Sequence, residues 1–279
     1  MPNVLVTGAG RGIGKTTTLR LAAAGWDVYA GVRNEADGDA LLAEAGERVH
    51  TLRLDVTSED DLKMLGGRLP PELHAVVNNA GIAVGGPIEA LRAEALREQL
   101  EVNVVGQVAV TQAVLPRLRA SRGRIVLVSS ISGRISNPNL GAYAASKFAL
   151  EAIADALRIE LHPWRIAVSL IEPGQIDTDI WRNAGDVLEE TVAGMRPEHR
   201  ELYAKHIDGM RKAIPLAQRM AASPDGVAKA IEHALTARRP KARYVIGATT
   251  KLQIALAGVT PTPMMDASLR KLTGVPRKP

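Results

Sequence analysis

The chain contains no cysteine among its 279 residues. Disulfide bonds, thiol catalysis and cysteine-ligated metal centres are therefore excluded, and the composition suits a reducing compartment. Aromatic residues are scarce as well, at 3% of the chain, although apolar residues of all kinds make up 46%. A chain of this length can bury a sizeable core, and we expect mainly aliphatic side chains to fill it.

Long hydrophobic runs and a dominant charge are also lacking. No run approaches the roughly 18 apolar residues of a membrane span, and no basic, then apolar, leader precedes the first strand pattern, so we expect a cytoplasmic protein. The net charge of +5 comes from 35 basic and 30 acidic residues along the chain. The densest basic cluster, residues 238–243, is short, so we expect a solvated surface there and no nucleic-acid partner.

Short runs rich in Val, Ile and Leu alternate with longer amphipathic segments. This pattern predicts strands at 3–7, 27–32, 49–55, 74–80, 124–130, 165–173 and 243–247. It predicts helices at 13–24, 35–45, 58–68, 88–119 (with a break near 101–103), 141–162 and 224–237. Alternating strands and crossover helices indicate an α/β class: a single-domain Rossmann fold with a doubly wound, mostly parallel, seven-stranded sheet.

Two segments do not follow this alternation of strands and helices. Residues 179–222 have mixed polarity and are too long for an ordinary connection, so we expect a helical insertion that forms a substrate lid. Residues 248–279 form a C-terminal extension. The insertion contains apolar residues that could face a lipophilic substrate or simply pack helix against helix. They are Trp181, Leu188, Val192, Met195, Tyr203, Ile207, Met210, Ile214, Leu216 and Met220.

The stretch "AGRGIGKT", residues 9–16, fits two nucleotide-binding patterns. Taken from Ala9 to Thr16 it is a loose Walker A loop, which needs an acidic magnesium partner and here lacks its first glycine. With glycines at 8, 12 and 14 it is instead a turn that leads from a strand into a helix. The backbone of such a turn can approach a pyrophosphate closely, and the partial positive charge of the helix N-terminus attracts this negative group. The second interpretation is favoured, although a tight connection can need glycine for structural reasons alone.

Tyr143 and Lys147 lie four residues apart in a predicted helix and therefore share a face. A phenol with a pKa near 10 exchanges protons poorly at neutral pH, and a nearby ammonium favours the phenolate. The pair is therefore predicted to lower the pKa of Tyr143. Ser130, at the carboxyl end of its predicted strand, could donate a hydrogen bond to a carbonyl or alkoxide oxygen. A tyrosine and a lysine at this spacing also occur at ordinary interfaces, so the pair alone decides little.

The full set of motifs is more specific. In chain order the sequence contains Thr7-Gly8-Ala9-Gly10-Arg11-Gly12-Ile13-Gly14, Asp55, Asn78-Asn79-Ala80-Gly81, Asn103, Ser130, Tyr143, Lys147 and Pro173-Gly174-x-x-x-Thr178. This ordered set resembles the short-chain dehydrogenase/reductase family closely over residues 1–178, and more loosely over 224–247. The segment "YAGVRN" and the tail beyond Gly247 look like the retinol and hydroxysteroid dehydrogenase branch. The resemblance implies an NAD(P)-dependent oxidoreductase that interconverts an alcohol and a ketone or aldehyde.

The resemblance also implies roles for individual residues. Tyr143 would be the general acid/base and Ser130 the oxygen stabiliser. Lys147 would activate the tyrosine and bind a ribose hydroxyl, and Asn103 would hold a water that links Lys147 to solvent. Asp55 would bind the adenine amino group. The cofactor-binding residues implied in all are Gly8, Gly10, Arg11, Gly12, Ile13, Gly14, Arg33, Asp55, Val56, Asn79, Ala80, Gly81, Tyr143, Lys147, Pro173, Gly174, Ile176 and Thr178. No metal site is predicted.

The second predicted strand bears on cofactor choice. Enzymes of this type that prefer NAD usually carry an acid at its end, bonded to the ribose hydroxyls. Here the position is Val32, and Arg33 follows directly. Arg11, inside the glycine turn, can reach the same ribose. Two guanidinium groups around one 2′-phosphate favour NADP(H) over NAD, unless both arginines are ordinary exposed charges.

Two alternative functions remain open from the sequence. One is a catalytically silent relative that binds NADP(H) as a redox sensor, although all four catalytic positions are filled here. The other is an epimerase or dehydratase of the extended branch, whose glycine turn usually has a different spacing. The partners expected are a small alcohol or carbonyl substrate and, in a homodimer or homotetramer, further copies of the chain. The stripes expected at the interface are Val104, Val108, Thr111 and Leu115, and Phe148, Ala152, Ala156 and Ile159.

Overall fold

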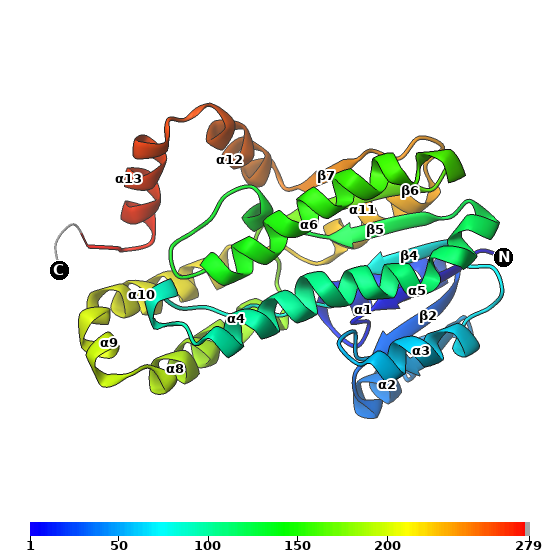
Figure 1. The fold of residues 1–279 in the computed structure, drawn as a ribbon, viewed down its shortest axis with the longest axis horizontal. Helices are drawn as coiled ribbons and strands as arrows, with labels where there is room; N and C mark the ends of the chain where they lie inside the picture. The colour runs from blue at the N-terminus through cyan, green and yellow to red at the C-terminus, as the bar shows by residue number, and fades with distance from the viewer. Residues whose placement is uncertain (277–279) are drawn as a thin grey trace.

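The computed structural model describes residues 1–276 and has a parallel sheet of seven strands at its centre (Figure 1). The strands are β1 (Asn3–Thr7), β2 (Asp27–Val32), β3 (Val49–Arg53), β4 (Ala75–Asn78), β5 (Arg124–Val128), β6 (Ala167–Pro173) and β7 (Arg243–Ile246). They lie in the order β3-β2-β1-β4-β5-β6-β7, and every neighbouring pair is parallel. The predicted doubly wound Rossmann-type sheet is therefore confirmed.

Helices cover both faces of the sheet, because the central strands β1, β4 and β5 are apolar on both sides. On β1, Val4 and Val6 face one core cluster and Leu5 faces the other. The first cluster is closed by α1 (Gly12–Ala23), α2 (Glu35–Leu42) and α11 (Asp225–Thr236). The second is closed by α3 (Glu59–Arg68), α5 (Gly106–Ser121) and α6 (Gly141–Glu160). A short 3-10 helix, η4 (His162–Trp164), follows α6.

The long helix predicted at 88–119 is divided into several pieces. A 3-10 turn η1 (Ile88–Ala90) comes first, then α4 (Ala93–Leu100), and a π-helical turn η2 (Glu101–Val105) joins α4 to α5. The predicted break near 101–103 is thus a π turn, a local widening that often occurs at functional sites. At its end, a Cβ added to Gly106 would lie 2.8 Å from the carbonyl oxygen of Val56, so the chain passes Val56 closely there.

Several strands end earlier than predicted, and just beyond β3 and β5 polar side chains bond to the backbone. β3 ends at Arg53 rather than residue 55, and the Asp55 carboxylate accepts a hydrogen bond from the Thr57 N–H at 2.9 Å. β5 ends at Val128 rather than residue 130. Ser130 instead caps the 3-10 turn η3 (Ile131–Gly133), with its Oγ accepting from the Ser132 N–H at 3.1 Å.

The insertion predicted at 179–222 is helical, as expected. It consists of α7 (Asp179–Arg182), α8 (Ala184–Gly194), α9 (Pro197–Leu202) and α10 (Ala204–Arg219). The C-terminal extension forms α12 (Ala248–Val259) and α13 (Thr262–Leu272), which arch from β7 toward this helical segment (Figure 1). Gly209 of α10 packs against the backbone of Gly274. Within residues 1–276, no helix combines the length and apolar character needed to cross a membrane.

Candidate active site

The candidate site lies at the carboxyl edge of the sheet, at the neighbouring strands β1 and β4. From β1 the sheet continues to one side through β2 and β3, and from β4 it continues to the other side through β5, β6 and β7. Such switch points are where parallel α/β sheets bind ligands. The Thr7 hydroxyl oxygen, at the end of β1, accepts hydrogen bonds from the N–H groups of Asn79 and Ala80, both at 3.0 Å. This joins the first turn of the chain to the Asn79-Ala80-Gly81 segment that follows β4.

The glycine turn after β1 is shaped to admit a bulky ligand against its backbone. Gly8 and Gly12 have φ angles of 62° and 53°, a left-handed conformation that favours glycine. A Cβ on Gly14 would lie 2.1 Å from the Gly8 carbonyl oxygen, so no side chain fits there. α1 begins at Gly12 and points its N-terminus at this turn. A glycine cradle at a helix N-terminus fits the pyrophosphate of a dinucleotide.

The Walker A interpretation is not supported by the structure. Lys15, the residue that would reach a phosphate in such a loop, forms an ion pair with Glu44 on the outer side of α1. Asp55, the candidate magnesium ligand, is bound by the hydroxyl and N–H of Thr57. The part of the chain that the structure describes also contains no cluster of His, Cys, Asp or Glu side chains suited to a metal ion.

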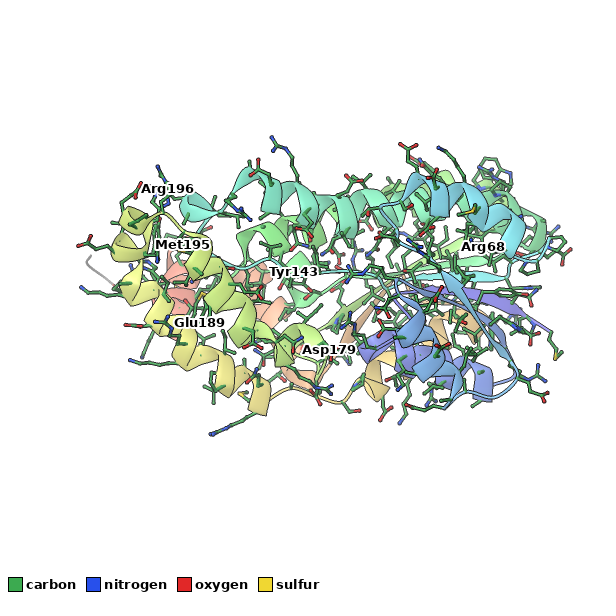
Figure 2. All side chains as sticks on the ribbon, turned by 90° about the horizontal axis from the view of Figure 1, so that it is seen from below. Arg68, Tyr143, Asp179, Glu189, Met195 and Arg196 are labelled. Carbon is green, nitrogen blue, oxygen red and sulfur yellow. The ribbon has the colours of Figure 1, made fainter. Side chains whose placement is uncertain are left out.

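The end of β6 and the start of the helical segment lie against the glycine turn. A Cβ on Gly12 would contact the Thr178 methyl group at 3.2 Å, so Thr178 lies beside the turn, 166 positions away in the chain. Arg11 and Asp179 form an ion pair at 3.4 Å. Figure 2 shows Asp179 at this junction and Tyr143 between the sheet and the helical segment. The fold therefore brings Gly12 and Thr178, both of which the resemblance implies as cofactor-binding residues, together at one edge of the sheet.

Asp55 and Arg33, which the resemblance implies as cofactor-binding residues, interact with each other. Burial by itself would raise the pKa of Asp55, but hydrogen bonds from Thr57 and the charges of Arg33 and Arg53 together hold it below its ordinary value. Asp55 is thus a carboxylate at neutral pH and is able to accept a hydrogen bond. Its interaction with Arg33 places that exposed guanidinium on the same side of the site.

Asn103, in the π turn, fixes the loop after β4. Its Oδ1 accepts from the Ile82 N–H at 2.8 Å, and its Nδ2 donates to the Ile82 carbonyl at 3.0 Å and to the Ser146 Oγ at 3.1 Å. The Ser146 hydroxyl in turn donates to the Tyr143 carbonyl at 2.7 Å. Asn103 therefore links the loop after β4 to the helix that carries Tyr143 and Lys147.

Tyr143 and Lys147 share one face of α6, as predicted, and the Lys147 Nζ lies 5.6 Å from the centre of the Tyr143 ring. Burial raises the pKa of Tyr143, and a hydrogen bond with Ser130 only partly offsets this. The predicted lowering by Lys147 is therefore wrong for this structure, because desolvation of the phenolate outweighs the interactions that favour it. Tyr143 carries its proton at neutral pH and can donate it.

Lys147 is buried beside this phenol. Its Nζ donates a hydrogen bond to the Val128 carbonyl at the end of β5, at 2.8 Å. Burial lowers the pKa of Lys147 to about 8, and the charge of Glu151 acts in the opposite direction. Lys147 is therefore mostly an ammonium at neutral pH, held within reach of the site by a main-chain acceptor.

Two residues near the site were missed by the sequence analysis. Asp37, at the start of α2, lies against the glycine turn, since a Cβ on Gly10 would be 2.7 Å from its Cβ. Its carboxylate is also 4.0 Å from Arg11. Thr250, at the start of α12, packs against Gly174 and is 5% exposed. Both contacts depend on tertiary packing, and neither residue belongs to a local motif.

A glycine cradle at the switch point of a parallel sheet, with a half-buried tyrosine and a buried lysine at the same edge, is the arrangement of a nicotinamide-dependent oxidoreductase. Comparison with known proteins assigns the family. The family model described as "short chain dehydrogenase" matches residues 2–188. This is more than half of the chain, and the chain belongs to the short-chain dehydrogenase family. It is an NAD(P)-dependent enzyme of the dehydrogenase/reductase type that acts on alcohol or carbonyl groups.

Individual relatives cover nearly the whole chain. An NADPH-dependent 3-dehydrocapnine reductase from Ornithobacterium rhinotracheale is 35% identical, over 98% of this chain and 99% of the relative. Retinol dehydrogenase 5 from Homo sapiens is 33% identical, over 95% and 87%. A solved short-chain dehydrogenase from Burkholderia cenocepacia, in complex with NADP, is 27% identical with a TM-score of 0.74, over 96% and 97%. The similarity to retinol dehydrogenases confirms the expected relation to that branch.

Proposed function

We propose that the protein is an NADP(H)-preferring oxidoreductase that interconverts a lipophilic alcohol and its ketone or aldehyde, with Tyr143 as the general acid/base. The observation that carries this proposal is the half-buried, protonated Tyr143 beside the Lys147 ammonium, at the edge that bears the glycine cradle. A positioned acid of this kind is what carbonyl reduction requires of the protein.

The chemistry that a bound nicotinamide supplies is hydride transfer to or from the substrate carbon. Tyr143 donates its phenolic proton to the carbonyl oxygen during reduction and takes it back during oxidation. Ser130 hydrogen-bonds the phenol and is placed to bond the same substrate oxygen. The Lys147 ammonium stabilises the phenolate left behind, because an adjacent positive charge favours the ionised form.

Cofactor preference rests mainly on Arg33. Arg33 is exposed at the end of β2, on the side of Asp55, and no carboxylate occupies the Val32 position before it. Arg11 is partly neutralised by Asp37 and Asp179, so we assign Arg33 the larger share of the attraction to a 2′-phosphate. The relative from Ornithobacterium rhinotracheale is named as NADPH-dependent, and the solved relative from Burkholderia cenocepacia contains NADP. Both support this preference.

Arg33→Ala is expected to weaken NADPH binding by about 1.5–3 kcal/mol, the range for a hydrogen bond to a charged group. NADH binding should change little, because NADH has no 2′-phosphate. The dissociation constants of both cofactors measure this, with Arg97→Ala on α4 as a matched exposed control. Raised salt should weaken NADPH more than NADH. Equal or tighter binding of NADH by the unaltered protein would overturn the preference.

Some of the apolar side chains in the helical segment, residues 179–222, face inward, and these support a lipophilic substrate. Leu188, Met195 and Ile207 are each 4% exposed, and a Cβ on Gly86 would contact the Met195 methyl group, so these side chains face inward. Leu216 and Met220, by contrast, are 60% and 65% exposed and do not line an interior surface. The substrate-lid role is therefore assigned to α8 and the start of α10. Reduction rates for ketones of increasing chain length test it, and a preference for short polar ketones would contradict it.

We further propose that the protein is a homodimer or homotetramer joined through α6. Phe148, Ala152, Ala156 and Ile159 form an exposed apolar stripe there, with Phe148 45% and Ile159 73% exposed. The sheet-facing side of α6 is a different one and contains Leu150. The other expected stripe, formed by Val104, Val108, Thr111 and Leu115, is not exposed along its whole length. Thr111 is buried and accepts a hydrogen bond from Asn78 at 2.8 Å.

Ile159→Glu is therefore expected to dissociate the assembly, because burial of a large apolar side chain contributes about 1.5–3 kcal/mol per copy. Multi-angle light scattering at micromolar concentration measures the mass of each variant. Met64→Glu, at a 45% exposed position on α3, is the matched control and should leave the mass unchanged. A strict monomer for the unaltered protein would refute the assembly.

A further inference from the structure

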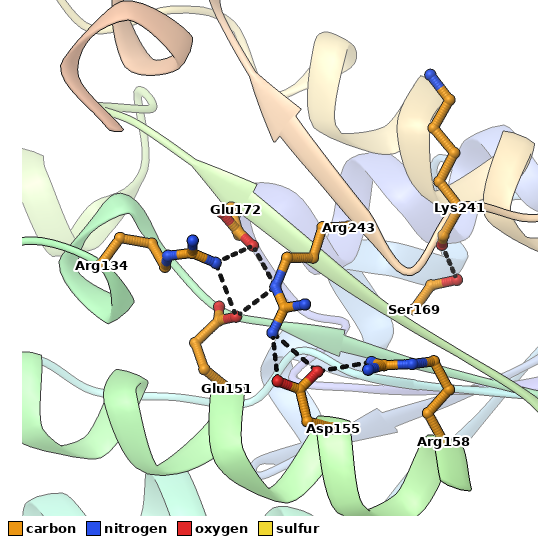
Figure 3. A network of polar contacts seen from close by, with 8 residues as sticks. All are labelled: Arg134, Glu151, Asp155, Arg158, Ser169, Glu172, Lys241 and Arg243. Atoms are coloured by element: carbon orange, nitrogen blue, oxygen red, sulfur yellow. Dashed lines mark hydrogen bonds and ion pairs between the residues drawn. The ribbon is translucent and has the colours of Figure 1, made fainter. Parts of the chain in front are cut away.

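A cluster of charged side chains lies between α6, β6 and β7, next to the Tyr143–Lys147 pair (Figure 3). Glu151 is one helical turn after Lys147 on α6. Glu172 is on β6, directly before Pro173, which the resemblance implies as a cofactor-binding residue. The two carboxylate side chains are only 9% and 1% exposed. None of the roles assigned so far uses them.

The two carboxylates converge on one arginine from β7. The Arg243 Nε is 3.0 Å from Glu151 Oε2 and 3.2 Å from Glu172 Oε1. The far end of the same guanidinium is engaged elsewhere, since Nη2 donates to both oxygens of Asp155 at 2.8 Å. The Nε–H group donates its hydrogen bond to Glu151, so Glu172 is left with an ion pair to the same nitrogen and no hydrogen bond from it. Arg134, beyond η3, contributes only longer ion pairs, at 3.9 Å to Glu151 and 3.8 Å to Glu172.

The carboxylates are short of hydrogen-bond donors. Among the described residues, Glu151 Oε1 and both oxygens of Glu172 are buried without a hydrogen-bond partner. A buried carboxylate oxygen without a donor is costly, and two carboxylates that share a buried site retain a proton more strongly than either would alone. One proton between Glu151 and Glu172 supplies an O–H donor and reduces the charge of the pair.

The electrostatics are consistent with this geometry. Burial, followed by the charge of Glu151, raises the pKa of Glu172 to about 7, although Arg134 and Arg243 act against the rise. Glu151 is also the charged group that favours the ammonium of Lys147, one turn away on the same helix. The charge of one member of the pair, Glu151, thus acts on Lys147.

We propose that Glu151 and Glu172 share one proton and act as a positioning pair for Lys147, so that the protonation of the pair sets the charge facing the catalytic ammonium. This inference rests on the proposed function. When the shared proton passes to solvent, the pair changes from one negative charge to two, and Lys147 keeps its ammonium proton to higher pH. The step involves no oxidant and no other group.

The other charges around the pair are balanced locally. Asp155 on α6 is matched by Arg243 and by Arg158, which it contacts at 2.6 Å. Asp155 is 44% exposed, so solvent screens it from Lys147 far more than it screens the buried pair. Asp155 is therefore a matched control, since it contacts the same arginine but lies outside the shared-proton pair.

Glu172→Gln keeps the shape of the side chain and its ability to donate to Glu151, but fixes the pair at one negative charge. In carbonyl reduction the active form needs the Lys147 ammonium, and a less negative pair lowers the pKa of Lys147. The alkaline limb of the pH profile of kcat/KM should therefore move to lower pH by about one unit. Asp155→Asn should leave that limb in place. Coinciding profiles for Glu172→Gln and the unaltered enzyme would overturn the link to Lys147.

Infrared difference spectroscopy tests the shared proton without any turnover. The unaltered protein should show a protonated carboxyl band at about pH 6 that disappears on titration through about pH 7 and is missing from Glu172→Gln. A spectrum without such a band would overturn the pair itself. If the band is present but no carbonyl is reduced, the proposed function fails while the proton sharing stands, so the two failures are distinguishable.

Discussion

Turnover of the Tyr143→Phe variant is expected to fall by about 10²–10⁴-fold, the contribution typical of a positioned general acid. The substitution removes the phenolic proton and leaves the ring, which packs beside Lys147. The glycine cradle is untouched, so the dissociation constant of NADPH should change little. Steady-state kcat and KM with an accepted carbonyl substrate, together with NADPH titration, separate the two effects.

Tyr244→Phe provides the matched control for this substitution. The Tyr244 hydroxyl oxygen on β7 accepts a hydrogen bond from the Lys241 N–H at 3.1 Å, so this variant also loses a tyrosine hydrogen bond, but outside the candidate site. It should retain turnover. A Tyr143→Phe enzyme that works at close to the unaltered rate would show that another group transfers the proton.

Gly14→Ala is expected to abolish most cofactor binding. The new Cβ would lie 2.1 Å from the carbonyl oxygen of Gly8 and 2.6 Å from the side-chain nitrogen Nδ2 of Asn79, so the turn must open. Overpacking of this kind typically costs about 1–3 kcal/mol of stability, and displacement of the turn should weaken NADPH by at least about tenfold. Thermal unfolding and NADPH titration measure the two losses.

The control for this backbone clash is Gly194→Ala at the end of α8, where an added Cβ meets nothing within 4 Å. It should bind NADPH normally. Normal binding by Gly14→Ala as well would mean that the pyrophosphate does not lie against this turn, and the cofactor site would have to be placed elsewhere.

The sheet could be predicted from the sequence because its signal is local. Apolar runs such as residues 3–7 and 27–32 are buried on both faces, and the structure has strands over the same residues. Strand ends were predicted less well, because side chains such as Asp55 and Ser130 bond to the backbone beyond them and end the strand early. The helix break near residue 103 was predicted, but not its π-helical geometry.

The candidate site was predictable only where residues form a motif. Tyr143 and Lys147 lie one turn apart, so their shared face follows from helix geometry. The pKa of Tyr143 depends instead on burial, which spacing does not reveal, and its expected direction was wrong. Asp37 and Glu172 reach the site region through packing between distant elements, and no local pattern marks either residue.

Transfer of deuterium from the nicotinamide of labelled NADPH to a carbonyl carbon tests the central claim most directly. A panel of ketones and aldehydes is incubated with the enzyme and labelled NADPH, and mass spectrometry of the alcohols locates the label. The account predicts label at the carbinol carbon with the unaltered enzyme, and loss of most of that signal with Tyr143→Phe. Tight NADPH binding with no labelled alcohol across the panel would contradict it and favour a cofactor-binding sensor.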